Sequence, residues 1–289
     1  MTTPRVTIGV PVCNGQEYLS QTLESLLGQS YRDFRIVIGD NASTDATGEI
    51  ARRFAEQDSR IHYIRHPMNL GAAVNYNRLF AMAESEYFRW SAADDLVAPS
   101  MLEQCVEELD QHSDVVLAYP RVILIGREGE VLESYEEGLH LPQERASDRF
   151  FGLLKHIRLC NALYGLLRSA AVRKTRPLGS YRGSDIVFQA ELALHGKFSE
   201  LSGTSFYRRM HPRAFHEMSP EAQRRFYYPE RREGVEFRIW RLFWEHHRSL
   251  VAAPIGARER IRILGGLARA VIASRNDLWQ ELVTAAFRR

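Results

Sequence analysis

The stretch from Glu86 to Pro99 decides the fold and reads Glu-Tyr-Phe-Arg-Trp-Ser-Ala-Ala-Asp-Asp-Leu-Val-Ala-Pro. Its aromatic first half is typical of a buried strand, and two adjacent carboxylates follow, Asp94 and Asp95. Adjacent carboxylates repel each other unless a cation lies beside them. We therefore expect a strand whose carboxyl end presents this acidic pair to a cleft. The alternative is that one of the two acids caps a helix that begins near Pro99.

Short apolar segments precede this stretch and alternate with segments of helical period. Strands are expected over residues 5–12, 34–39 and 61–65, and the helices that follow them are expected to end near Gly28, Gln57 and Ala83. Strands alternating with helices at this spacing predict a mostly parallel sheet with right-handed crossovers. Such sheets bind ligands where the carboxyl ends of the strands meet the loops, so the polar clusters after these strands should share one rim.

Two of these helices carry a capping signal. Asn14 and Glu17 have the spacing of a capping box, with Asn in place of the usual Ser or Thr. Thr44 or Asp45 can cap the second helix. Both segments are therefore expected to pass from strand to helix within a few residues.

The alternation is less regular after a helix expected from Pro99 to about His112. The next expected elements are one or two strands over 115–125 with a hairpin at Gly126, a helix over 145–156, a strand over 161–168, a helix over 184–195 and a strand pair over 198–209. Beyond His216 the chain is rich in Arg and aromatic residues. This part is predicted to be helical, with a break at Pro254 and a last amphipathic helix over 258–287.

Composition limits the class of protein. The 289 residues can bury a full core, and 45% hydrophobic with 26% charged residues is ordinary for a soluble globular protein. A net charge of +2 gives no reason to expect nucleic acid as a partner, although arginine suits phosphate contacts. Three cysteines without disulfide or metal-site spacing fit a reducing compartment. With no apolar signal core and no run of about 20 apolar residues, a cytoplasmic protein is expected.

Four motifs occur in order over the first hundred or so residues. They are Pro11-Val-Cys-Asn-Gly-Gln-Glu-Tyr-Leu, Gly39-Asp-Asn-Ala-Ser-Thr-Asp, Asn69-Leu-Gly and Ala93-Asp-Asp-Leu-Val-Ala-Pro. With these motifs the chain resembles glycosyltransferase family 2, the inverting nucleotide-sugar transferases of GT-A fold. A weaker match continues through Gly183-Ser-Asp and Arg208-Arg-Met-His to about Pro212.

The resemblance implies an α/β fold of GT-A type, in which helices flank a Rossmann-like, mostly parallel central sheet. The GT-A domain would cover residues 1–215. Its nucleotide-sugar-binding half would be 1–112 and its acceptor-binding half 113–215. Residues 216–289 would form a helical C-terminal extension.

The resemblance also implies a nucleotide-sugar site built from several loops. Asp40 would hydrogen-bond the nucleobase, while the loop from Pro11 to Glu17 would pack on the base and ribose. The residues assigned to this site are Pro11, Val12, Asn14, Glu17, Asp40, Asn69, Gly71, Arg78 and Asp94. Most have a structural alternative: Asp40 can be a turn acid, Asn69 and Gly71 the turn that starts a helix, Glu17 only the box partner of Asn14, and Arg78 a solvated side chain.

A divalent cation, Mn²⁺ or Mg²⁺, is implied as the cofactor. Asp95 would hold it on the diphosphate of the donor, Asp94 would lie against the ribose or donor sugar, and His211 would approach the metal or the phosphates. Hard cations prefer carboxylate and phosphate oxygens, so this assignment is chemically sound. The alternative for His211 is an ordinary loop histidine. Arg208 and Arg209 are further candidates for the phosphates.

Two positions depart from the family pattern. Ala92 stands where an Asp is common, so metal binding would rest on fewer carboxylates. Cys13 stands where Tyr is usual, and we expect it to be a small buried thiol.

Inversion requires an acceptor hydroxyl to lose its proton as it attacks. The family places an acid at the start of the helix that lines the acceptor side, and Asp185 matches that position, which makes it the candidate catalytic base. The alternative is that Asp185 is a helix cap.

The expected function is therefore metal-dependent transfer of a sugar from a nucleoside-diphosphate sugar to a hydroxyl of a glycan, a lipid-linked glycan or a small molecule. Two alternatives are a sugar-phosphate nucleotidyltransferase and a nucleotide-sugar-binding protein without turnover. The C-terminal helices are expected to close the domain, with peripheral contact to the inner face of the membrane or a homodimer as further options.

Overall fold

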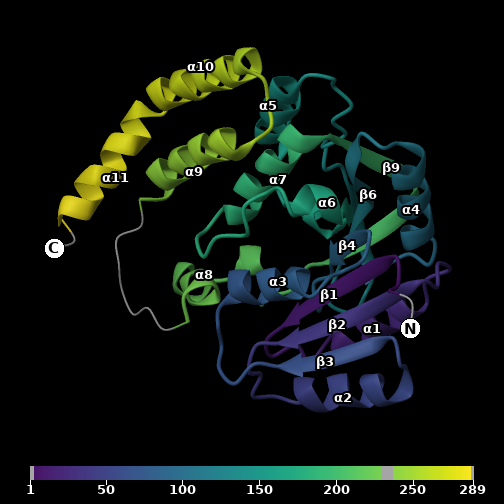
Figure 1. The fold of residues 1–289 in the computed structure, drawn as a ribbon. Helices are drawn as coiled ribbons and strands as arrows, with labels where there is room; N and C mark the ends of the chain where they lie inside the picture. Colours follow the sequence, from purple (N-terminus) through teal and green to yellow (C-terminus); the bar gives the residue numbers. More distant parts are fainter. Residues whose placement is uncertain (1–2, 230–236, 288–289) are drawn as a thin grey trace.

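The computed structural model describes residues 3–229 and 237–287 and contains a central sheet covered by helices (Figure 1). The sheet has nine strands in the order β3-β2-β1-β4-β8-β6-β9-β5, and β7 pairs with β6 outside this order. Its two halves differ in strand direction.

The first half of the sheet is parallel. It consists of β3 (Ile61–Arg65), β2 (Phe34–Asp40), β1 (Val6–Val12) and β4 (Tyr87–Trp90). All seven residues of β1 are buried because this strand lies inside the sheet with helices on both faces. The predicted strands of this half, including the one before the acidic pair, are confirmed.

The second half of the sheet is mixed. Its strands are β8 (Leu166–Arg168), β6 (Val115–Ile125), β9 (Lys197–Arg209), β5 (Leu96–Val97) and β7 (Val131–Tyr135). The short β8 is antiparallel to β4 and to β6, whereas β6 and β9 are parallel. The expected hairpin at Gly126 joins β6 to β7. The prediction of a mostly parallel sheet therefore holds for the first half, whereas the second half has both parallel and antiparallel pairs.

Two sets of helices cover the sheet. One face carries α1 (Leu19–Leu27), α2 (Thr47–Gln57) and α4 (Met101–Gln111), and the other carries α3 (Ala72–Ala81), α5 (Ala146–His156), α6 (Ser169–Val172) and α7 (Ser184–His195). Each set closes its own hydrophobic core. Because both faces are covered, a ligand can reach this sheet only at its edges and strand ends.

Trp90, the last residue of β4, lies at the centre of one core. Its ring is 4.9 to 6.2 Å, between centroids, from the rings of Phe88, Phe188, Tyr76 and Phe80. The indole N–H also donates to the carbonyl oxygen of Tyr76 over 3.0 Å. Aromatic pairs in such tilted and edge-on arrangements add to the free energy of burial. This packing fixes the end of β4 and the start of the loop that carries the acidic pair.

The start of α1 differs from the prediction. The helix begins at Leu19, and its N-cap residue makes no side-chain cap. Asn14 instead adopts a left-handed conformation with φ of 55°, which Asn tolerates better than most residues. Its side-chain oxygen accepts a hydrogen bond from the N–H of Thr44 over 2.8 Å. The capping-box prediction is wrong because Asn14 ties two loops together and does not start a helix.

The starts of α2 and α4 also lack the expected caps. The N-cap residue of α2 is Ala46, although the Asp45 carboxylate accepts from the N–H of Thr47 over 3.0 Å. The N-cap residue of α4 is Ser100, so neither acid of the pair caps that helix. The structural alternative for the acidic pair is therefore excluded.

Two strand predictions in the second half are wrong. Residues 161–168 form a 3₁₀ helix, η1 (Asn161–Tyr164), followed by the three residues of β8. The chain turns at Gly165, where an added Cβ would lie 2.6 Å from the carbonyl oxygen of Ala118. Residues 198–209 belong to one strand, because β9 stays paired with β6 across an irregularity between Leu201 and Ser205.

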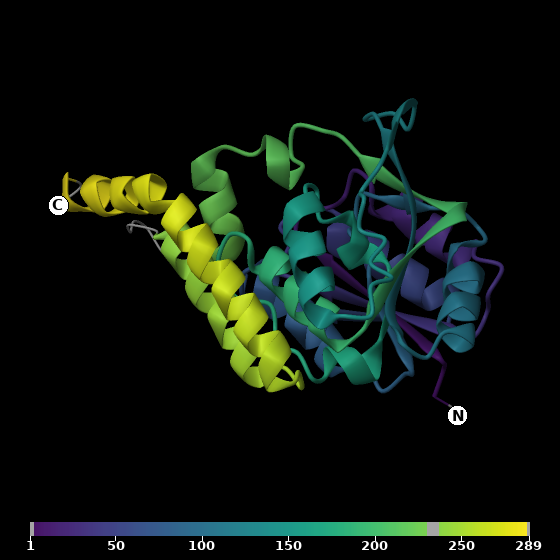
Figure 2. The same cartoon turned by 90° about the horizontal axis from the view of Figure 1, so that it is seen from above.

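The described chain after β9 is helical. It contains η2 (Phe215–Glu217), α8 (Pro220–Tyr227), α9 (Arg238–Ala252), α10 (Ala257–Ala273) and α11 (Arg275–Phe287). Helix α9 packs on α7 and α10 packs on α5, while α11 continues away from the body (Figures 1 and 2). The helix expected over 258–287 is thus two helices that meet at Ser274. Residues 230–236 and 288–289 of the expected extension lie outside the described residues.

None of the described helices is both long enough and apolar enough to cross a bilayer.

Candidate active site

A pocket of about 830 Å³ lies at the carboxyl ends of β1 and β4. Its lining comes from segments far apart in the chain, namely 11–18, 41, 69, 72–76, 92–95, 164 and 208–226. Pockets that bind small molecules commonly have volumes of about 300–1,000 Å³. The pocket lies at the rim where the sequence predicted a ligand site.

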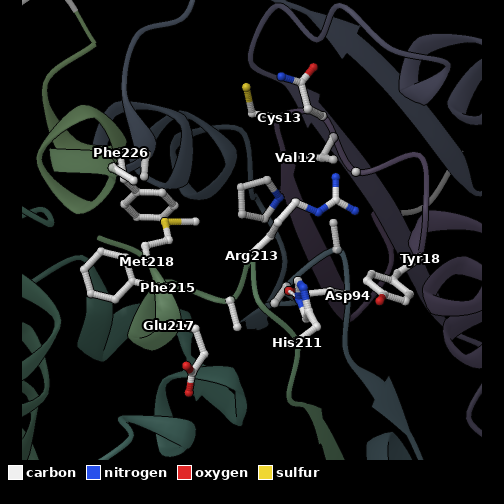
Figure 3. Close-up of a pocket in the computed structure, with 18 of the residues that line it drawn as sticks. Val12, Cys13, Tyr18, Asp94, His211, Arg213, Phe215, Glu217, Met218 and Phe226 are labelled. Carbon is white, nitrogen blue, oxygen red and sulfur yellow. Dashed lines mark hydrogen bonds and ion pairs between the residues drawn. The ribbon is translucent and has the colours of Figure 1, made fainter. Parts of the chain in front are cut away.

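The pocket has two walls, which Figure 3 shows on opposite sides of the cavity. The strand-end wall consists of the lining residues in 11–18, 41, 69 and 92–95, and it includes Val12 and Tyr18. The helical wall consists of the lining residues in 212–226, and it includes Phe215, Met218 and Phe226. Asp94 and His211 lie side by side in the same view.

The end of β9 holds the acidic pair in place. Because β5 pairs with β9 just after the two acids, residues 209–211 lie directly against them. The backbone N–H of Arg209 donates to Asp95 Oδ1 over 2.8 Å, and its Nε donates to the carbonyl oxygen of Asp94 over 2.9 Å. His211 Nε2 lies 2.9 Å from Asp94 Oδ2. Asp95 itself is only 6% exposed.

Burial and the adjacent charge of Asp94 raise the pKa of the Asp95 carboxyl above its usual range. The nearby guanidinium of Arg208 acts in the opposite direction but does not cancel the first two effects. The acidic pair is therefore short of positive charge, and a cation beside it would favour the ionised form.

The two arginines at the end of β9 have different surroundings. Arg209 is buried, and its guanidinium donates to the carbonyl oxygen of Arg127 over 2.7 Å and to Gln21 Oε1 over 2.8 Å. Arg208 lines the pocket, where its Nη1 donates to Asn161 Oδ1 over 2.5 Å. Both arginines line the pocket and both bond within the chain, since Arg208 also donates to the carbonyl oxygen of Leu159 over 2.6 Å. Arg208 is only half-buried, whereas Arg209 is 1% exposed, so Arg208 is better placed for a ligand.

Amide side chains form the floor of the strand-end wall. Asn41 Nδ2 donates to Asn69 Oδ1 over 2.7 Å, and the N–H of Leu70 donates to Asn41 Oδ1 over 2.8 Å. Both asparagines line the pocket, as do Pro11, Val12 and Asn14. Asn41 lies inside a family motif but is not among the residues assigned to the site from the sequence, so this lining residue was missed.

Cys13 lies in the same wall but is exposed, so the expectation of a buried thiol is wrong. Its Sγ donates to the carbonyl oxygen of Asn41 over 3.5 Å. The loop after β1 turns outward at this point because its backbone bonds to the loop after β2, where the N–H of Asn14 donates to Ser43 Oγ.

Asp40 is completely buried and does not line the pocket. Its Oδ1 accepts from the N–H of Ser43 over 2.8 Å, and its Oδ2 accepts from the hydroxyl of Tyr63 over 2.7 Å. Burial and this carboxylate raise the pKa of Tyr63 to about 12. Contact between Asp40 and a nucleobase would require one of these partners to move, and its assigned role stays a prediction.

Glu17 also lies outside the pocket lining. Its carboxylate forms ion pairs with Arg127, at 2.9 Å, and with Arg213. Arg127 belongs to the β6–β7 hairpin and Arg213 to the helical wall. Glu17 therefore links the two walls from outside the cavity and is not the capping partner that the sequence suggested.

Gly71 and Arg78 lie outside the lining as well. Gly71 has a φ of 81°, and an added Cβ would lie 2.7 Å from the carbonyl oxygen of Tyr227, so this glycine allows α8 to approach the start of α3. The Nη1 of Arg78 lies 3.3 Å from His66 Nδ1. Gly71 and Arg78 therefore make contacts around the pocket and do not face its cavity.

Asp185 lies in the first turn of α7, but the N-cap residue is Gly183, so Asp185 does not cap the helix. It does not line the pocket, yet its charge reaches groups that do. Burial, followed by the charges of Asp94, Asp95 and Asp185, raises the pKa of Tyr76, a lining residue. The acidic pair and Asp185 thus act on the same lining tyrosine, although about 90 residues separate them in the chain.

Several lining residues were not anticipated from the sequence. They are Tyr18, Asn75, Tyr76, Tyr164 and the helical wall, including Arg213, Phe215, Arg225 and Phe226. Tyr76 and Tyr164 meet through their hydroxyl groups, 3.3 Å apart. The sequence signal for the helical wall is the cluster of aromatic residues between 215 and 228, which by itself predicts only a helix.

A divalent cation in this pocket would need oxygen or nitrogen ligands from nearby side chains. Within residues 3–229 and 237–287, no group of three or more His, Cys, Asp or Glu side chains is arranged to hold a metal ion. Mg²⁺, however, commonly binds one or two carboxylates and completes its shell with substrate phosphates and water. Asp94, Asp95 and His211, with the unbalanced charge of the acidic pair, fit a cation that shares its ligands with a bound diphosphate.

The sequence matches Glycosyl transferase family 2 over residues 7–168, more than half of the chain. A putative teichuronic acid biosynthesis glycosyltransferase, TuaG of Bacillus subtilis, is 28% identical over 145 residues, which cover 50% of this chain and 56% of TuaG. The chain spans about half the length, or less, of the curated relatives that it matches.

Solved structures share the fold. TarS from S. aureus in complex with UDP-GlcNAc is similar with a TM-score of 0.67 and 17% identity, over 93% of this chain and 73% of that one. Mannosyltransferase PcManGT from Pyrobaculum calidifontis, in complex with GDP-Man and Mn2+, has a TM-score of 0.54 and 16% identity, over 100% of this chain and 87% of its own. The GT-A-type α/β fold that the sequence predicted is confirmed. From the sequence match over residues 7–168 and this shared architecture, the chain belongs to glycosyl transferase family 2.

Proposed function

We propose that this protein transfers a sugar, with inversion, from a nucleoside-diphosphate sugar to a hydroxyl of a glycan, a lipid-linked glycan or a small molecule. The observation that carries the proposal is the pocket in which the acidic pair, Arg208 and His211 meet the loops of the family motifs. Membership of the family supports the same reaction class.

In this proposal the strand-end wall binds the nucleoside part of the donor. Pro11 and Val12 offer an apolar surface to a base, and Asn14 and Asn69 offer hydrogen-bonding groups. The diphosphate lies toward Arg208, whose guanidinium can donate to phosphate oxygens while it remains bonded to Asn161. Arg213 and Arg225 of the helical wall lie on the other side, where they pair with Glu17 and Glu221.

We propose that transfer depends on Mn²⁺ or Mg²⁺ held by Asp95, with Asp94 and His211 beside it. A bound divalent cation would stabilise the negative charge that develops on the departing diphosphate. The structural support is the acidic pair, whose partial burial and mutual repulsion favour a positive partner. Without a third carboxylate at Ala92, we expect the free protein to bind the cation weakly and the donor complex to bind it more strongly.

Asp185 is the proposed general base. The acceptor oxygen attacks the anomeric carbon from the face opposite the diphosphate, the bond from this carbon to the diphosphate oxygen breaks, and the hydroxyl proton passes to the Asp185 carboxylate. The acceptor would enter from the side formed by α7 and the helical wall, which belong to the second half of the sheet and the extension. This division agrees with the proposed acceptor-binding half over residues 113–215.

Two rival functions make different predictions. A sugar-phosphate nucleotidyltransferase would release pyrophosphate from a nucleoside triphosphate and a sugar 1-phosphate, but the amino-terminal Gly-rich loop with a Lys that it needs is missing from the sequence. A binding protein without turnover would leave the donor intact when an acceptor is supplied. Measuring pyrophosphate release and donor cleavage separates the three functions.

A thermal-shift panel tests the proposal directly. UDP-, GDP- and dTDP-sugars are each added with Mn²⁺ and again with EDTA, and at least one of them should raise the melting temperature in a manner that EDTA reverses, because a ligand that binds only the folded state stabilises it. A panel with no shift at all would contradict nucleotide-sugar binding. A shift that EDTA leaves unchanged would contradict only the metal dependence.

A further inference from the structure

The C-terminal helices carry most of the exposed apolar surface of the described chain. Eight of the twelve large apolar side chains that are exposed among the described residues lie between Phe237 and Leu282. Soluble proteins expose single apolar residues everywhere, but a concentration on neighbouring elements marks an interaction surface. Helices α9 and α10 run side by side along one flank of the molecule (Figures 1 and 2).

The outer side of α10 combines apolar and cationic residues. Ile261 and Ile272 are 69% and 63% exposed and lie three helical turns apart, so they share one face. Arg258, Arg262 and Arg269 are exposed beside them on the same side of the helix. The opposite side of α10 is buried against α5.

Helix α9 repeats this arrangement. Trp244 and Val251, 60% and 70% exposed, lie two turns apart, and Arg241 and Arg248 are exposed next to them. The residues of α9 that face inward, such as Leu250, pack against the body. We call the exposed residues of α9 and α10 the outer helical face.

Two acidic residues lie beside these arginines: Glu259 pairs with Arg262 at 2.8 Å, and Glu245 lies 3.3 Å from Arg248. Glu245 is buried and accepts from the Arg176 guanidinium over 2.6 Å. Glu259 accepts from the backbone N–H of Ser147 over 2.8 Å. Among the described residues of α9 and α10, therefore, every exposed side chain with a permanent charge is an arginine.

We propose that the outer helical face docks on the surface of a lipid bilayer that contains anionic phospholipids. Arginine guanidinium groups pair with lipid phosphates, and tryptophan and isoleucine side chains insert at the boundary between headgroups and acyl chains. Helices α9 and α10 would lie in the plane of this surface.

Charge favours a membrane over a second copy of the chain. In a symmetric dimer the same patch faces itself, so the excess of exposed arginine in one copy would meet the same excess in the other, while Glu245 and Glu259 already pair with arginines of their own copy. An anionic bilayer supplies the missing negative charge at every position along the face.

Vesicle sedimentation tests this inference with the full-length protein and needs no sugar donor, so its result is independent of the transferase proposal. The probes are vesicles of phosphatidylcholine alone and vesicles in which about one third of the lipid is phosphatidylglycerol. We expect the protein to sediment with the anionic vesicles and to remain in solution with the neutral ones. Raising the salt concentration should release it, because salt screens the attraction.

Two double variants locate the contact. Ile261→Glu with Ile272→Glu should lower the partition onto anionic vesicles at least about tenfold, and Arg258→Glu with Arg269→Glu should do the same. The matched control is Val131→Glu with Leu132→Glu, because these residues are similarly exposed on β7, away from the outer helical face. All three variants change exposed side chains, and the control should bind as the unaltered protein does.

Three results would overturn the proposal. The first is no binding to anionic vesicles, or equal binding to both vesicle types. The second is unchanged binding of the Ile261 and Ile272 variant. The third is a dimer, detected by light scattering without lipid, that this variant dissociates, because that result would assign the face to a second copy.

Discussion

The two walls of the pocket are built in different ways. The strand-end wall is a network of polar contacts, such as the bond from Asn41 to Asn69 and the bond from the N–H of Arg209 to Asp95. The helical wall is held by ring contacts, with Phe215 at 5.1 Å from Phe226 between centroids. A polar network fixes directions, whereas an aromatic cluster fixes shape. We infer that the strand-end wall governs the binding and reaction of the donor. Substitutions in the helical wall should affect the donor less.

Removal of the buried acid of the strand-end wall should have the largest effect. In Asp95→Ala we expect Mn²⁺-dependent donor binding to disappear and turnover to fall by about 1,000-fold or more, because the cation loses its main ligand. Isothermal titration with donor, with Mn²⁺ and again with EDTA, measures the first effect. Asp277→Ala, an exposed acid on α11, is the matched control. Metal-dependent binding that survives in Asp95→Ala would contradict the assigned site.

The next largest effect should come from Asp185→Asn. The amide keeps the shape of the side chain but cannot accept the proton, so turnover should fall by about 100- to 10,000-fold while donor affinity stays near normal. Steady-state kinetics and donor titration measure the two quantities separately. If the variant keeps its turnover, the base lies elsewhere; if it loses donor affinity as strongly as turnover, Asp185 belongs to the donor side.

The folded state should lose stability in acid because of a buried histidine on α9. Burial lowers the pKa of His246 on α9 to about 4, from an ordinary value of 6.5, and the charge of Arg176 acts in the same direction. The unfolded state then binds more protons below pH 6.5, so stability is lost as the pH falls from 6.5 toward 4. The expected cost is about 2 kcal/mol at pH 5 relative to neutral pH.

Denaturant titrations at several pH values measure this cost. The comparison is between the unaltered protein and His246→Leu, which removes the titrating group while other groups still titrate in both proteins. The variant should show a smaller loss of stability between pH 7 and pH 5. Parallel curves for the two proteins would mean that His246 does not carry the effect.

The smallest effect is expected in the helical wall itself. Phe226→Ala enlarges the pocket on one side, and we expect about a tenfold increase in the KM for the acceptor with little change in donor affinity, as one lost aromatic contact would give. Phe237→Ala, which removes an exposed ring outside the pocket, is the control. An equal loss of donor affinity in Phe226→Ala would break the distinction between the two walls.

The strand-end wall could largely be predicted from the sequence. Its strands are short apolar runs bounded by polar clusters, and the order of strands and helices determines that the clusters share a rim. Asp94, Asp95, Pro11 and Val12, which the sequence assigns to the site, all line the pocket. These patterns can be recognised in a single sequence because each strand and the loop that follows it are consecutive.

The helical wall could not be predicted in the same way. Phe215 and Phe226 reach the pocket only because α8 packs against the start of α3, a contact between segments about 150 residues apart. Asp40 illustrates the opposite failure: it lies at the end of β2 as expected, but the hydroxyl of Tyr63 on the neighbouring strand bonds to its carboxylate. Contacts with segments elsewhere in the chain decided both outcomes, and a single sequence does not reveal them.

The side chain of Arg209 has a consequence for engineering. It bonds to the backbone of Asp94 at the site, to the backbone of Arg127 at the hairpin and to Gln21 on α1, and its guanidinium stacks 4.6 Å from the centre of the Tyr18 ring. An insertion in the hairpin would therefore displace the Arg209 side chain and, with it, the loop that carries Asp94 and Asp95. Libraries aimed at new acceptors should leave residues 126 and 127 untouched and vary the tip beyond them.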